Sequence, residues 1–252
     1  MKRTERHHLK QDPFAATLQG TFERLDRNRR QVTIGVTVIV VVLIAAGGWV
    51  WWRGHTETRA AGLLAEALVV AESPVDQPPT PAGENGVPAA ATLPQPGTFA
   101  TERERDEAAL ERFLAAADAH PNTQPGIAAR YHAAATLASF GRDGEAAEQY
   151  QQVIDRAGRH FYARVARLGL AEVQVRQGQF DPAIASYQEL ITTAKDELPV
   201  DGVLMQLGRA YRLAGREAEA QQAFKRIIDE FPQSTFAAEA RRELDAVPGG
   251  AA

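Results

Sequence analysis

The sequence predicts an all-α protein, in which one N-terminal transmembrane helix precedes an α-solenoid of similar helical hairpins. The first observation behind this prediction is an uncharged apolar run of 21 residues, 32–52. The second is internal repetition with a period of 37 residues in the C-terminal half, because a repeated supersecondary unit is typical of solenoids. The composition, 44% hydrophobic and 24% charged over 252 residues, is that of a folded chain with one or two domains.

The uncharged run has the length of a membrane span. As a helix it would reach about 31 Å, close to the ~30 Å hydrocarbon core of a bilayer. Trp49, Trp51 and Trp52 lie together at its C-terminal end, as in an interfacial aromatic belt. The alternative is a cleaved signal peptide, but the basic region is long, the run exceeds the usual 7–15 residues, and Arg53 follows it directly. An uncleaved, single-pass anchor is therefore favoured.

The charge distribution predicts the orientation of this helix. Residues 1–31, a basic cytoplasmic head, carry eight Lys/Arg against four Asp/Glu, and only Arg53 and Arg59 lie close to the other end of the run. Because basic flanks stay in the cytoplasm, the N-terminus is expected inside and everything after Trp52 outside. In a Gram-negative bacterium that means the inner membrane and the periplasm.

The basic head contains a short helical pattern. Asp12 and Pro13 resemble an N-cap and a first helical residue. Apolar residues then follow at helical spacing: Phe14, Leu18, Phe22 and Leu25. Three interpretations stay open, namely an amphipathic helix on the inner leaflet, a cytoplasmic binding segment, and a basic tail that only sets the topology.

Four segments follow the run. Residues 53–72 are a juxtamembrane segment whose positions 57–72 have a helical apolar period. Residues 73–100 form a Pro-rich linker that holds seven of the 14 prolines, so an extended, disordered loop is expected. Residues 101–246 are the repeat domain, and 247–252 are a tail.

Equivalent positions of the repeats hold similar residues. At the predicted end of each first helix stands a glycine, which would provide the C-terminal turn. Small residues on both helices would let them approach closely, and an aromatic residue would fill the gap towards the next unit. The four columns are Gly141, Gly178 and Gly215; Ala134, Ala171 and Gly208; Ala146, Ala183 and Ala220; and Tyr150, Tyr187 and Phe224.

Capping patterns mark the helix starts. Thr101 and Glu104 form a capping-box pattern before a helix over 102–119, and Asp181 and Pro182 suit the start of another. Thr123 and Ser234 are expected N-caps. We interpret helix 102–119 as the second half of an earlier repeat, whose first half is helix 57–72. A last helix over about 235–246 would cap the stack, with its charges, Glu239, Arg241, Arg242 and Glu243, on an exposed outer face.

The third unit resembles a tetratricopeptide repeat. The residues at the family's spacings are Leu207, Gly208, Tyr211, Gly215, Ala220, Phe224 and Pro232. The units at 127–158 and 164–195 match less well, because Leu137 and Gln174 stand where the third unit has Tyr211. The resemblance implies a protein–protein interaction domain.

The whole layout is similar to a narrower family, the bacterial ancillary subunit of the Sec translocon (YfgM-like). That resemblance implies a membrane-anchored adaptor whose partners are translocon subunits, a periplasmic chaperone or exported chains. Two alternatives stay open: a scaffold for outer-membrane or cell-wall assembly machinery, and a regulatory subunit of an envelope enzyme. Lipoproteins of outer-membrane assembly with such repeats need a lipidated cysteine, and the chain has none.

The sequence argues against an enzyme. The lack of cysteine excludes thiolate zinc sites, iron–sulfur clusters, disulfides and cysteine nucleophiles. No phosphate-binding glycine loop, H-E-x-x-H or G-x-S-x-G motif occurs, and no two of the six histidines are four residues apart. The net charge of −4 does not suit a general nucleic-acid binder. No catalytic residue, cofactor, metal, nucleic acid or small-molecule substrate is therefore expected.

What remains is a surface along the first helix of each repeat, the expected concave side of the solenoid. The repeat register predicts nine groove residues: Tyr131, Ala135, Ala138, Leu168, Glu172, Val175, Met205, Arg209 and Arg212. The hypothesis is that this groove holds a polypeptide, with Tyr131, Leu168 and Met205 in apolar contact and the two arginines meeting carboxylates. The alternative is that these residues only form the surface of a short superhelix and bind no partner.

Overall fold

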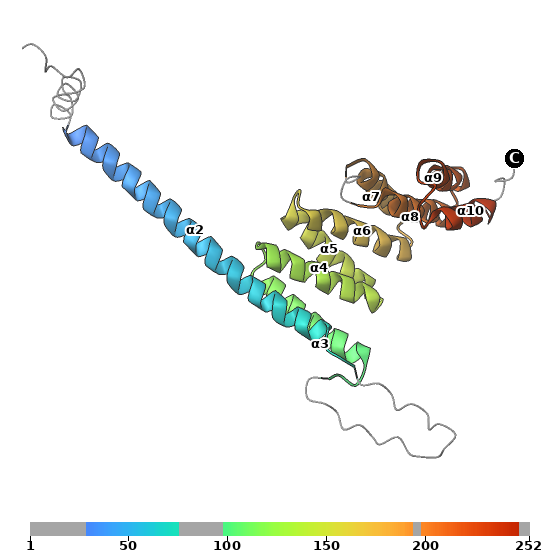
Figure 1. The fold of residues 1–252 in the computed structure, drawn as a ribbon, viewed down its shortest axis with the longest axis horizontal. Coiled ribbons are helices and arrows are strands. Elements are labelled where there is room, and N and C mark those ends of the chain that lie inside the picture. Colours follow the sequence, from blue (N-terminus) through green and yellow to red (C-terminus); the bar gives the residue numbers. More distant parts are fainter. Residues whose placement is uncertain (1–28, 76–97, 194–197, 247–252) are drawn as a thin grey trace, which may run out of the picture. The chain divides into compact units, whose positions relative to one another are not determined.

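The structure is a computed structural model that describes residues 29–75, 98–193 and 198–246. These residues form helices and contain no β-strand, only one isolated bridge (Figure 1). The all-α prediction is confirmed. The expectations for the head before residue 29, for linker residues 76–97 and for the tail lie outside the described residues. The chain divides into two compact units, residues 1–55 and 56–252, which are described separately below.

Helix α2, Arg29–Ala71, contains the uncharged run and the juxtamembrane segment without a break. From Thr33 to Ala71 it is long and apolar enough to cross a membrane, and it is the one such helix among the described residues. Between residues 33 and 52 its side chains are exposed throughout. At the end of the run the Arg53 guanidinium lies 5.5 Å from the Trp49 ring centroid, and Trp51 stacks on His55.

The second unit is a stack of helical hairpins (Figure 1). From α3 to α10 each helix packs on the next one along the chain. Three complete hairpins, α4–α5, α6–α7 and α8–α9, correspond to the three predicted repeats. The last helix packs on α9, in the predicted capping position. The bounds are α3 Glu102–Ala119, α4 Gln124–Ser139, α5 Asp143–Ala157, α6 Phe161–Arg176, α7 Phe180–Thr193, α8 Val200–Leu213, α9 Glu217–Glu230 and α10 Ala237–Ala246.

The C-terminal part of α2 belongs to this stack. Ala60 and Ala67 are buried, and Ala67 lies in one core cluster with Ala109 and Phe113 of α3. The two ends of the Pro-rich segment meet, because the Phe99 amide donates a hydrogen bond of 3.1 Å to the Pro74 carbonyl. The C-terminal part of α2 thus packs on the N-terminal core of the stack, although the linker separates it from α3 in sequence.

Glycines end the three first helices in the same way. Gly141, Gly178 and Gly215 have φ values of 71°, 75° and 73°, in the left-handed region. At Gly178 the glycine amide donates to the Val175 carbonyl, and the following Gln179 amide donates to Gln174, a Schellman motif that satisfies two terminal carbonyls. The same two bonds recur at the other glycines. The predicted turn is confirmed.

Replacing Gly178 with alanine is expected to destabilise the repeat stack by about 1–2 kcal/mol, because an L side chain is strained at positive φ. Gly144 is the matched control, since it lies inside α5 and an added Cβ would meet no atom within 4 Å. Gly144→Ala should be neutral or stabilising by up to about 1 kcal/mol. Urea unfolding followed by circular dichroism measures both. Equal stability of the two variants would contradict the assigned role of Gly178.

The capping predictions hold at two helix starts. Thr101 accepts a hydrogen bond from the Glu104 amide at 3.1 Å, and Thr123 accepts one from the Gly126 amide at 3.2 Å. Helix α7 starts at Phe180, one residue before Asp181, so this aspartate lies in the first turn. Ser234 accepts from the Phe236 amide just before α10, and its hydroxyl donates to Asp201.

The small and aromatic columns form the contacts between helices. An added Cβ on Gly208 would lie 2.5 Å from the Phe224 ring, so this glycine lets α8 and α9 of one hairpin approach closely. The Tyr150 ring instead packs on Gly169 of the next hairpin, at the same distance from an added Cβ. The predicted gap-filling role towards the next unit therefore applies to Tyr150, whereas Phe224 also fills its own hairpin.

Candidate partner-binding surface

The first helices line one side of the stack. Besides their hairpin partners, α4 packs on α6 and α6 packs on α8, so these first helices form one continuous layer, called the inner surface below. All nine predicted groove residues lie on these three helices. Three of them, Glu172, Val175 and Arg209, line one shared hollow of about 280 Å³. Three residues that were not predicted complete its lining: Arg176, Tyr187 and Gln206.

Three tyrosines, one on each of the helices α4, α5 and α6, form an aromatic cluster. The Tyr131 ring centroid is 6.0 Å from that of Tyr150 and 5.7 Å from that of Tyr162. Burial raises the pKa of Tyr131, and the charge of Glu172 raises it further. Ala135 and Ala138, which follow on α4, are half-buried.

The three apolar side chains predicted to contact a partner, Tyr131, Leu168 and Met205, differ in their exposure. Met205 is fully buried in the C-terminal core, so in this conformation its side chain is not accessible to a bound polypeptide. It packs there with residues of α7 and α9 in one core cluster. Leu168 is partly buried and packs against the same core, and Tyr131 keeps a partly exposed ring.

The two predicted basic residues are already paired within the chain. Arg209 donates to Glu239 and Arg212 donates to Glu243, both on α10. The Glu243 side chain is only 16% exposed. The expectation that the α10 glutamates lie on an exposed outer face is therefore wrong for this residue, because α8 presents two arginines to the capping helix. A partner carboxylate would have to displace these glutamates.

Glu172 is the residue of the hollow whose charge is not compensated. It forms no ion pair and no side-chain hydrogen bond within the described ranges. Burial raises the pKa of Glu172, and nearby Arg176 lowers it in part. Arg176 itself is held by Asp143 at 2.6 Å. The charge of Glu172 also raises the pKa values of Tyr150 and Tyr187, after the larger effect of their burial.

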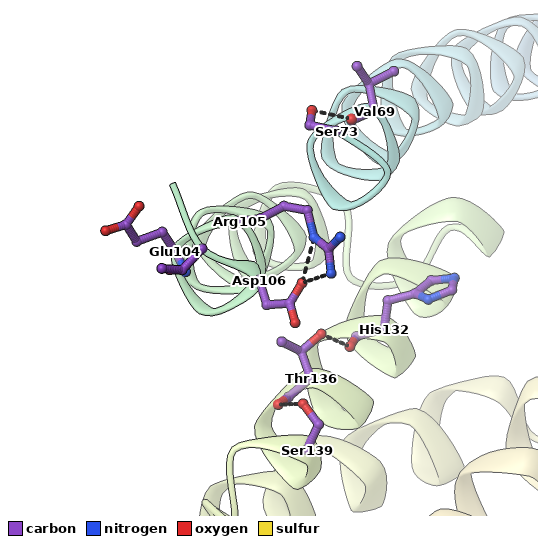
Figure 2. A network of polar contacts seen from close by, with 9 residues as sticks. Val69, Ser73, Glu104, Arg105, Asp106, His132, Thr136 and Ser139 are labelled. Carbon is purple, nitrogen blue, oxygen red and sulfur yellow. Dashed lines mark hydrogen bonds and ion pairs between the residues drawn. The ribbon is translucent and has the colours of Figure 1, made fainter. Parts of the chain in front are cut away.

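Other polar contacts are structural. Arg130 is buried and joins three helices, since it donates to Asp118 of α3 at 2.6 Å and to Gln149 of α5 at 2.7 Å. Figure 2 shows local bonds near the start of the stack. Thr136 donates to the His132 carbonyl within α4, and Ser73, just after the end of α2, donates to the Val69 carbonyl. The described residues contain no group of three or more potential metal ligands.

A family model describes nearly the whole chain. The model of the tetratricopeptide repeat-like domain matches residues 25–247, which include both the uncharged run and the hairpins. This chain belongs to the tetratricopeptide repeat-like domain family.

Two crystal structures resemble the tetratricopeptide repeat-like protein. They contain the nearly identical TPR-like repeats of a Podosopora anserina protein, one of them as a single-residue variant. Each is 17% identical, covers 59% of this chain and 88% of its own, and aligns with a TM-score of 0.48. A comparison with curated proteins finds no match. Tetratricopeptide-like repeats are a protein-interaction scaffold.

We expect Glu172 to make the stability of the tetratricopeptide repeat-like protein depend on pH. Its pKa is raised in the folded state, so its favourable contribution is present below its ordinary pKa and is lost as the pH rises through the raised value. Glu172→Gln should therefore be more stable than the wild type at neutral pH, and the difference should disappear in acid. Thermal unfolding at pH 7 and at about pH 4 tests this. A variant less stable than the wild type at pH 7 would contradict the assignment.

Proposed function

We propose that this protein is a single-pass adaptor of the bacterial inner membrane, with a cytoplasmic N-terminus and periplasmic repeats that bind protein partners. The observation that carries the proposal is one helix, α2, that contains an exposed, uncharged run of membrane-spanning length and then contributes buried residues to the repeat stack. The match to one family model over both parts supports treating them as one functional unit.

The physical basis for the membrane location is the exposure of the run. Leaving a Val, Ile or Leu side chain in water rather than burying it costs about 1.5–3 kcal/mol. Nine such side chains from Ile34 to Ile44 are exposed, and the described chain offers nothing that covers them. A lipid core is the environment that removes this cost, while the helix satisfies its own backbone hydrogen bonds. The eight basic residues before the run support the proposed orientation.

The proposed partners follow from the layout of the chain. Its similarity to the ancillary subunit of the Sec translocon points to translocon subunits, a periplasmic chaperone or exported chains. The inner surface supports the binding of a polypeptide, because it combines partly exposed aromatic side chains with a polar hollow. In this role no covalent bond is made or broken by the protein.

Site-specific crosslinking in intact cells tests the proposal. A photoreactive residue at Val175 or Gln206, in the hollow, should form crosslinks to translocon subunits, a chaperone or exported chains. Asp229 is the control site, because it lies exposed on α9, outside the hollow. Crosslinks to cell-wall enzymes or outer-membrane assembly factors would instead support the scaffold alternative. If hollow and control sites give the same products, the surface is not the binding site.

A further inference from the structure

We infer that the hollow at Glu172 receives a basic side chain, lysine or arginine, of a polypeptide lying along the first helices. The inference rests on the proposed function, namely that this surface binds polypeptide, and adds the chemistry by which a partner is recognised. The hypothesis from the sequence was the reverse, with Arg209 and Arg212 meeting carboxylates of a partner. The distribution of ion pairs in the structure favours a cation instead.

The hollow has the size and position for one side chain. Its volume of about 280 Å³ lies just below the range of small-molecule pockets, which begins near 300 Å³. It lies between α6 and α8, with Tyr187 of α7 as a nearly buried wall. Val175 supplies a partly buried apolar side chain, against which the methylene stem of a lysine or arginine can pack.

Among the charged residues that line the hollow, Glu172 is the one without an ion pair in the described part of the chain. Arg176 is paired with Asp143, and Arg209 is paired with Glu239. The lining itself holds Glu172, Arg176 and Arg209. With the two ion-pair partners Asp143 and Glu239, which lie outside the lining, these five groups sum to a net charge of −1. A cationic side chain would neutralise that charge, whereas an anionic one would first have to break an existing pair.

The surroundings of Glu172 strengthen such an interaction. Charges attract more strongly where burial lowers the effective dielectric constant. Glu172 is half-buried, and burial is also the largest cause of its raised pKa. Tyr131, Tyr150 and Tyr187 all sense its charge, so aromatic side chains lie around it. Tyr150 and Tyr187 are buried, so of the three rings only that of Tyr131 is accessible in part to a cation.

The test uses the full-length protein in detergent micelles and three labelled peptides of about ten alternating serine and leucine residues. The peptides differ only at the central position, which is lysine, norleucine or glutamate, and binding is measured by fluorescence anisotropy. The lysine peptide should bind about tenfold or more tightly than the other two, as expected for a charge-assisted hydrogen bond. Glu172→Gln should abolish this preference.

Glu148→Gln is the matched control, because Glu148 is an exposed glutamate on α5 outside the hollow. It should keep the preference for lysine. Circular dichroism shows whether each variant is folded. Equal binding of the three peptides, or a lysine preference that survives Glu172→Gln, would overturn the inference while leaving polypeptide binding in place. Absence of lysine-peptide binding to the wild type would also overturn it, and the crosslinking experiment would decide separately on the proposed function.

Discussion

Replacing both Val41 and Leu43 with aspartate is expected to move the protein from the membrane fraction to the soluble fraction. Both side chains are exposed near the middle of the uncharged run. An aspartate at the centre of a spanning helix costs about 2.5–3.5 kcal/mol, so two together cost roughly 5–7 kcal/mol. That corresponds to a change of about three orders of magnitude or more in the insertion equilibrium. Carbonate washing of membranes followed by immunoblotting measures the distribution.

The control for this experiment is a variant with the same change of charge outside the run. Val69 and Leu213 are exposed apolar residues, one near the end of α2 and one at the end of α8. Val69→Asp with Leu213→Asp should leave the protein in the membrane. If the control variant is released as completely as the variant in the run, residues 32–52 are not what anchors the chain.

Phe224→Ala is expected to destabilise the repeat stack by about 3–5 kcal/mol, the usual cost of removing a buried phenyl ring. Phe224 is fully buried, packs on Gly208 and belongs to the core that joins α7, α8, α9 and α10. Because a domain has a net stability of only about 5–15 kcal/mol, the C-terminal hairpin should unfold at a much lower urea concentration. Urea unfolding followed by circular dichroism measures the shift.

Leu213→Ala is the control for this substitution. It removes a large apolar side chain of the same hairpin that is 57% exposed, so its effect should stay within about 0.5 kcal/mol. A loss at Leu213 equal to that at Phe224 would show that the core of the third repeat is not where the structure places it.

The architecture of the repeats was predictable because backbone geometry limits the choice of residue. Only a glycine is unstrained at the positive φ that ends α4, α6 and α8, so Gly141, Gly178 and Gly215 mark the hairpins in the sequence. Close helix contact likewise limits position 208 to a very small residue, since any Cβ there would meet the Phe224 ring. The 37-residue period of these positions therefore identifies the units from the sequence alone.

The candidate site was less predictable, because it depends on ion pairs between helices. The alignment of equivalent repeat positions does not predict which charged residues form such pairs. The register assigned Arg209 and Arg212 to the first helix of the third repeat, where α8 holds them. It could not show that Glu239 and Glu243 of α10 neutralise them, since α10 lies beyond the third repeat. It also treated Glu172 as one groove position among nine. Its importance appears only when the other charges of the hollow are found to be paired.

The burial of Met205 has a similar explanation. Whether a position that faces the next helix is exposed or buried depends on the distance between the two helices. Helical periodicity in the sequence does not predict that distance. In the structure α6 and α8 are close enough to bury Met205 completely. The inner surface is therefore more polar than its sequence implies, which favours recognition by charge over recognition by apolar contact.

Protease accessibility in spheroplasts tests the central claim most directly, namely that α2 anchors a repeat domain on the outer side of the inner membrane. With an epitope tag at each end, added protease should remove the C-terminal tag and degrade the repeats. The N-terminal tag should remain protected in a fragment that carbonate does not extract. A C-terminal domain that stays intact until the membrane is dissolved, or a full-length chain in the carbonate supernatant, would contradict the account.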